Sequence, residues 1–208
     1  MSMPATPPTR RPCRSSVPVR PARGPGSRVI ACRTTIPFGR DNDGTPVSWD
    51  LSAGRHLLIR RDERRSSPSV SLDLIAMTTL TGGTHDLVVV DPHRRHRWLG
   101  GSASLPTGPC CWATTTDQIT DVVAELDSPV VGAPRVLLVA DLAATVAALD
   151  DEGRTRLARV AGDARERQLL LVATTADTNP RWYPEGLIDA FDDVVERRRE
   201  QRPSVGLR

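Results

Sequence analysis

The stretch HLLIRRDERRSSPSVSLDLIAMTTL, residues 56–80, decides the fold of this chain. It opens with a short apolar run, HLLI, which is typical of a strand that is buried on both faces of a sheet. A polar, charged loop follows, and VSLDLIAMTTL then favours a helix. A buried strand that leads through a loop into a helix is the opening unit of an α/β fold.

Apolar runs of the same kind recur along the chain. Together with HLLI they predict four buried strands near residues 56–60, 86–91, 135–140 and 168–174. Helical patterns separate them: TTDQITDVVAELDS has apolar residues at 119, 122, 123 and 126, and residues 142–167 predict one or two further helices. The pattern indicates a mostly parallel sheet covered on both faces, and the turn signal Asp43-Gly44 predicts a small β-hairpin over 29–52 at its edge.

The ends of the chain differ from its body in composition. Residues 1–28 are rich in proline, arginine, serine and glycine, which predicts a disordered arm. Eight of the 28 arginines and none of the 25 acidic residues precede Asp41, which leaves 20 arginines against 25 acids, a net charge of about −5, in 41–208. We therefore expect a mildly acidic domain over 29–195, with a basic arm before it and a polar tail, 196–208, that frays.

Residue usage excludes several kinds of chemistry. The chain contains no lysine, a bias that we attribute to GC-rich codon usage, so no step that needs a lysine amine is available. No C-x-x-C pair occurs, and His93 and His96 lack further ligands at suitable spacing, so we expect no metal site. The cysteines are Cys13, Cys32, Cys110 and Cys111. Without a run of ~20 apolar residues or the apolar core of a secretory signal, we expect a cytoplasmic protein with no membrane span.

The segment IPFGRDNDGTPVSWDLSAGRHLLI, residues 36–59, resembles the lead-in to the motor domain of the FtsK/SpoIIIE family of DNA translocases. That family typically reads I-P-x-G-x-D-x-x-G-x-P-x-x-x-D-L, a short spacer, and H-L-L-[IV]. The residues that match in register are Ile36, Pro37, Gly39, Asp41, Gly44, Pro46, Asp50, Leu51, His56, Leu57 and Leu58. DLVVVDP, PRVLLVAD and LARVAGDARERQLLLVATT resemble the later strands and helix of that fold, so the resemblance covers roughly residues 34–176.

The resemblance implies a RecA-like, P-loop-type three-layer sandwich with a mostly parallel sheet, but the phosphate-binding Walker A motif, G-x-x-x-x-G-K-[ST], is missing. Aligned without a gap, its two glycine positions fall on Arg61 and Ser66, and an extra glycine of the family falls on Arg64. Its lysine falls on Ser67 and its magnesium-binding hydroxyl on Pro68. Glycines let backbone N–H groups wrap a phosphate, and the side chains of Arg61 and Arg64 would fill that space. Pro68 offers neither a hydroxyl nor an N–H. We do not expect the arginines to replace the lysine, because Asp62 and Glu63 lie among them.

The second half of the implied site is damaged as well. The resemblance places Asp141 at the magnesium-binding acid of the Walker B strand, but Leu142 stands at the catalytic carboxylate. Asp141 alone is accounted for as the N-cap of the following helix. The sensor strand usually ends in Thr-Gln, and here it ends in Thr174-Thr175. We therefore expect no catalytic residue, no nucleotide site and no cofactor.

The favoured hypothesis is a catalytically inactive domain that acts as a structural or regulatory partner of an active translocase, because the family's active members work as ring assemblies on double-stranded DNA or in protein secretion. One alternative is a divergent ATP-dependent DNA translocase, which would need ATP and Mg²⁺. A second is a basic-armed accessory protein that binds DNA phosphates. Its candidate DNA-binding residues are Arg10, Arg11, Arg14, Arg20, Arg23 and Arg28. A third is a decaying gene, and the oligomeric state is left open.

Overall fold

The computed structural model describes residues 34–40, 43–61, 69–100, 111–128 and 132–196. Its centre is a six-stranded sheet in the order β5-β4-β6-β7-β3-β8, in which every neighbouring pair of strands is parallel. The strands are β3 (Leu57–Arg60), β4 (Asp86–Val90), β5 (Cys111–Ala113), β6 (Arg135–Val139), β7 (Leu169–Thr175) and β8 (Asp193–Glu196). Both the four expected strands and their parallel arrangement are confirmed.

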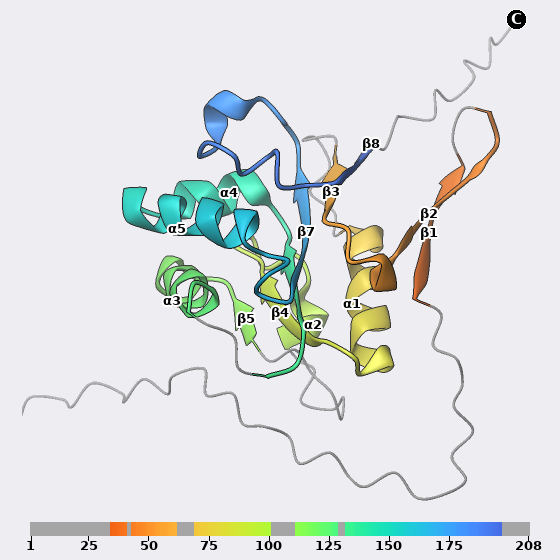
Figure 1. Ribbon diagram of the computed structural model, residues 1–208, viewed down its shortest axis with the longest axis horizontal. Coiled ribbons are helices and arrows are strands. Elements are labelled where there is room, and N and C mark those ends of the chain that lie inside the picture. The colour runs from red at the N-terminus through yellow and green to blue at the C-terminus, as the bar shows by residue number, and fades with distance from the viewer. Residues whose placement is uncertain (1–33, 41–42, 62–68, 101–110, 129–131, 197–208) are drawn as a thin grey trace, which may run out of the picture. The chain divides into compact units, whose positions relative to one another are not determined.

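Helices cover both faces of this sheet (Figure 1). On one face lies α1 (Val70–Gly82), together with the short α2 (Arg97–Gly100). On the other lie α3 (Thr116–Leu126), α4 (Leu142–Ala148) and α5 (Asp151–Gly162). Successive strand residues enter opposite cores: Leu57 and Ile59 pack toward α1, whereas Leu58 packs toward α3–α5. The result is the three-layer α/β fold that the sequence predicts.

The helix boundaries follow from local chemistry. Thr115 caps α3 by accepting a hydrogen bond from the N–H of Gln118, whose side chain reciprocates in a capping box. The positions expected to be apolar on this helix, Ile119, Val122, Val123 and Leu126, are all buried. Helix α1 ends at Gly82. The next residue, Gly83, adopts a left-handed conformation with a φ of 59°, which terminates the helix.

The N-terminal hairpin forms, but it does not extend the main sheet. Strands β1 (Thr35–Arg40) and β2 (Pro46–Asp50) pair with each other in a separate antiparallel sheet. Ile36 and Trp49 pack into the α1-side core, so apolar burial and not strand pairing holds the hairpin on the domain. The expectation of a hairpin at the sheet edge is corrected accordingly.

Two strands were not expected from the sequence. The three-residue β5 is too short to give an apolar run. The edge strand β8 ends at Glu196, the first residue of the tail, 196–208, that the sequence predicts to fray. Backbone pairing with β3, in which Val194 lies beside Leu58, explains why this polar segment is ordered. Residues 197–208 and the arm, 1–28, lie outside the described residues.

Candidate functional site

The carboxyl ends of the parallel strands form the edge of the sheet where α/β folds bind ligands, particularly where neighbouring strands lead the chain in opposite directions. One such point lies between β4 and β6, because the chain passes from β4 to β5 on one side and from β6 to β7 on the other. A second lies between β7 and β3, which lead to β8 and to β4. The residues that follow these four strands are therefore the first to inspect for a ligand site.

Asp141 follows β6 and has its carboxylate engaged within the protein. One oxygen, Oδ1, accepts a hydrogen bond from the N–H of Ala144 at 3.0 Å, so Asp141 is the N-cap of α4 as expected. The other oxygen, Oδ2, lies 3.3 Å from Nε2 of His93 and 4.0 Å from Nη1 of Arg95. A Mg²⁺ ion that approached this carboxylate would compete with both side chains.

Leu142, the next residue, points away from this edge into the core. It is 1% exposed and belongs to the cluster between the sheet and α3–α5. The position at which an ATPase of the resembling family carries its catalytic carboxylate is therefore part of the hydrophobic core.

Internal hydrogen bonds also engage the end of β7, the strand that the resemblance places at the sensor position. Thr174 donates its hydroxyl to the carbonyl of Ala140, the residue directly after the neighbouring strand β6. The Thr175 hydroxyl lies 2.6 Å from the Tyr183 hydroxyl, and both hydroxyls contact the carbonyl of Asp177. Burial raises the pKa of Tyr183, so the phenol stays protonated and available for this network.

The end of β3 leads toward the expected phosphate loop. The N–H of Arg61 donates to the carbonyl of Thr175 at 2.7 Å, so the parallel pairing continues one residue past β3. The chain is described again at Ser69, whose hydroxyl caps α1. The intervening positions singled out from the sequence, Arg64, Ser66, Ser67 and Pro68, lie outside the described residues.

The loop after β4 is held rigidly by two acids. The fully buried carboxylate of Asp91 accepts hydrogen bonds from the N–H groups of Arg95 and His96, at 3.0 and 2.8 Å. Within the loop Arg94 has a φ of 52°, a left-handed conformation that is uncommon for a residue with a side chain. The second acid is Asp73 of α1. Its Oδ1 lies 2.7 Å from Nδ1 of His96 and accepts a hydrogen bond from Nε1 of Trp98 at 2.6 Å.

Several residues that match the translocase pattern have structural roles. Asp50 accepts a hydrogen bond from the N–H of Ser52 and caps the 3-10 turn Leu51–Ala53. His56, directly before β3, contacts β7 and the residue directly before β8. Its N–H donates to Asp192 at 2.7 Å, and its Nδ1 accepts from the N–H of Leu171 at 3.1 Å. Burial lowers the pKa of His56, which keeps Nδ1 unprotonated as this bond requires. The matching residues thus preserve the frame of the fold.

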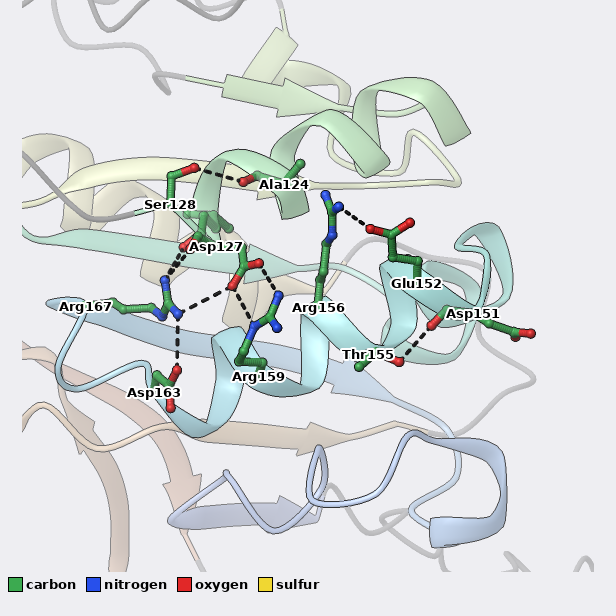
Figure 2. Close-up of polar contacts among 11 residues, drawn as sticks. Ala124, Asp127, Ser128, Asp151, Glu152, Thr155, Arg156, Arg159, Asp163 and Arg167 are labelled. Carbon is green, nitrogen blue, oxygen red and sulfur yellow. Dashed lines mark hydrogen bonds and ion pairs between the residues drawn. The ribbon is translucent and has the colours of Figure 1, made fainter.

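Three arginines in and after α5 pair with neighbouring acids (Figure 2). Asp127, at the end of α3, receives both Arg159 of α5 and Arg167. The Arg159 hydrogen bond is the main reason that the pKa of Asp127 lies below its usual value. The candidate DNA-binding arginines of the arm lie outside the described residues.

A cavity of about 440 Å³ lies at the opposite, amino-terminal edge of the sheet. Its lining includes Thr84, His85, Arg165 and Gln168. None of the described residues that the sequence predicts for a site is among its lining residues. Among the described residues, no group of three or more histidine, cysteine, aspartate or glutamate side chains is arranged to hold a metal ion.

Among known proteins, this chain is similar to solved structures and not to a family model or a curated protein. No family model matches the chain, and no curated protein matches it. Among solved structures, it is similar to Thermomonospora curvata EccC (ATPases 2 and 3) in complex with a signal sequence peptide, with 22% identity and a TM-score of 0.59 over 77% of this chain and 32% of that one. EssC (ATPases 2 and 3) from Geobacillus thermodenitrificans has 16% identity and a TM-score of 0.56 over 78% and 33%.

A third solved structure, the pCW3 conjugation coupling protein TcpA with ATPγS, has 15% identity and a TM-score of 0.51 over 76% of this chain and 52% of that one. At these identities the likeness shows the fold, which is that of the P-loop ATPase units in secretion and conjugation proteins. The chain spans about a third or less of the two EccC structures that it matches.

The interaction of His93 and Arg95 with Asp141 was not expected from the sequence. From the sequence, HRRH (residues 93–96) raises only the question of a metal site. Its position directly after a buried strand was the available signal, because the carboxyl ends of parallel strands converge on one edge. Which side chain would reach Asp141 depends on the loop conformation set by Asp91, and this cannot be read from the motif.

No helix in the described part of the chain is long and apolar enough to cross a membrane.

Proposed function

We propose that this chain is a catalytically inactive, FtsK/SpoIIIE-like P-loop domain that acts as a structural or regulatory partner of a DNA or protein translocation machine. The observation that carries the proposal is the state of the Walker B position. Asp141 is engaged by Ala144, His93 and Arg95, and the adjacent catalytic position is a core leucine. A nucleotide site needs free carboxylate oxygens at this edge to hold Mg²⁺.

The sequence of the phosphate loop supports the same proposal independently. Three defects coincide there: arginines at two glycine positions, Ser67 at the lysine position and Pro68 at the hydroxyl position. A phosphate loop depends on backbone N–H groups and on one lysine, and this chain contains no lysine that another segment might lend.

The solved structures with a similar fold favour a translocation setting. They include a type VII secretion ATPase and a conjugation coupling protein, and two of them carry more than one ATPase unit. A single unit of this fold without a working site therefore suits a role beside active units. This step rests on likeness of fold and is part of the proposal.

The partner role is tested with an intact FtsK/SpoIIIE-type ATPase encoded in the same genome. The two purified proteins should form a complex in size-exclusion chromatography, and the ATPase rate of the intact enzyme should change when this chain is added. Substitution Asp141→Asn in this chain should leave that effect unchanged, because no nucleotide is turned over here. Absence of both a complex and a rate effect would contradict the partner role and favour a decaying gene.

A further inference from the structure

Helix α1 exposes an apolar stripe on the surface of the domain. Val70, Leu74 and Met77 are 59%, 42% and 42% exposed, and their spacing of four and three residues aligns them along one side of the helix. The opposite side of the same helix, which includes Leu72 and Ile75, is buried against the sheet. A helix that is apolar on both sides is typically covered on both sides.

The apolar stripe contains no charged side chain that would oppose the binding of another apolar surface. The helix contains one charged residue, Asp73, and its carboxylate is bound by His96 and Trp98. Asp73 lies three residues after Val70 and four before Met77, so it borders the stripe directly. The segment 96–98 therefore runs along one side of the stripe.

The loop after β4 carries two arginines, in this segment and just before it, that have no acidic partner among the described residues. Arg97 lies between the two residues that contact Asp73, and Arg94 precedes them in the same loop. Both side chains are exposed, and within the described ranges no carboxylate pairs with either. Most other arginines of the domain are paired; these include Arg55, Arg135, Arg154, Arg156, Arg159, Arg165 and Arg167. An apolar stripe with unpaired arginines on the adjoining loop fits a partner that carries carboxylates beside apolar side chains.

We propose that the stripe formed by Val70, Leu74 and Met77, together with Arg94 and Arg97, is a docking surface for an acidic amphipathic helix of another protein. Apolar side chains spaced four and three residues apart would cover the stripe, and carboxylates beside them would meet the arginines. Met77 suits such a contact because its flexible thioether adapts to different side chains. This surface would serve the partner role proposed above, although its test does not depend on that role.

Charge separates this occupant from the other candidates. The arm, 1–28, holds arginines and no acid, and residues 197–208 hold five arginines against Glu200, so both termini would be repelled by Arg94 and Arg97. Nucleic acid would pair with the arginines but would leave the apolar stripe uncovered. A membrane surface is favoured by bulky aromatic anchors and several basic residues, and the stripe has no aromatic residue.

The probe is a fluorescein-labelled, helix-forming peptide of about 16 residues, with leucines at i, i+4, i+7 and i+11 and glutamates beside them. Fluorescence anisotropy should show saturable binding to the full chain, with a Kd on the order of 10–100 μM. Leu74→Ser and Arg97→Glu should each weaken binding about fivefold or more. The matched controls, Trp182→Ser and Arg181→Glu, alter an exposed aromatic residue and an exposed arginine between β7 and β8 and should leave binding unchanged.

Several results would overturn the proposal. These are the absence of saturable binding, equal losses in the control variants, and equal affinity for a peptide with lysines in place of its glutamates. Two parallel measurements address the other occupants. Concentration-dependent dimerisation in sedimentation that Leu74→Ser abolishes would assign the stripe to a second copy. Cosedimentation with phosphatidylglycerol vesicles that the same variant abolishes would assign it to a membrane.

Discussion

Leu142 provides the sharpest test of whether the catalytic position has become part of the core. We predict that Leu142→Glu, which restores the carboxylate found there in the resembling family, destabilises the domain and does not create an active site. Removal of a fully buried leucine side chain costs about 3–5 kcal/mol, and Leu142 is 1% exposed. A carboxylate in this core adds about 1.4 kcal/mol for each unit by which its pKa is raised. A domain of ordinary stability, about 5–15 kcal/mol, would lose a large part of its free energy of unfolding.

Urea unfolding followed by circular dichroism measures this loss, and the midpoint should fall by at least about 1 M. The deficit should be larger at pH 7 than at pH 5, because protonation of the introduced glutamate removes the buried charge. Two controls bracket the result. Leu142→Met keeps the apolar volume and should cost less than about 1.5 kcal/mol, whereas Leu74→Glu makes the same change at an exposed helical position and should cost little. A Leu142→Glu protein as stable as the unmodified chain, with Mg²⁺-dependent ATP binding, would refute the reasoning.

Three further predictions concern the frame and the arm. Asp127→Asn should lower the melting temperature by about 2–6 °C, because it weakens the contacts with Arg159 and Arg167, whereas the same change at fully exposed Asp151 should shift it by less than about 1 °C in differential scanning fluorimetry. Burial lowers the pKa of His56 in the folded protein, so the stability that neutral His56 contributes is fully present above the unfolded pKa near 6.5 and is lost as the pH falls. His56→Gln should therefore make the melting temperature fall less between pH 7 and pH 5. Part of the fall should remain, because burial lowers the pKa of His85 too. Deletion of residues 1–28 should leave the melting temperature unchanged, and a drop of several degrees would show that the arm packs on the domain.

The sheet could be predicted from the sequence because its strands are continuous apolar runs. Such runs are characteristic of strands buried on both faces of a sheet. A helix between two of them returns the chain to the same edge of the sheet, so the strands run parallel. Asp43-Gly44 predicts the hairpin but not its position on the domain. A hairpin that pairs with the edge of the main sheet and one that packs on its face through apolar side chains have the same local sequence pattern. Strand β8 was missed because its polar residues gain order from pairing with β3, a contact between segments more than 130 residues apart.

The candidate site was predicted in part. The N-cap role of Asp141 follows from its position between a strand and a helix, and the structure bears it out. The approach of His93 and Arg95 to the same carboxylate could not be predicted, since it depends on the buried carboxylate of Asp91 and on the left-handed backbone of Arg94. The apolar stripe on α1 was hidden for a similar reason: the sequence shows which residues of a helix are apolar, but in an apolar helix it does not show which side is covered.

We propose that this domain has the frame of a P-loop ATPase and no nucleotide site. Isothermal titration calorimetry of the full chain with ATP, at millimolar nucleotide and with excess Mg²⁺, tests it most directly, with a parallel assay for phosphate release. We predict no saturable binding heat and no hydrolysis above background. Saturable binding with micromolar affinity would contradict the claim and favour a divergent ATP-dependent translocase.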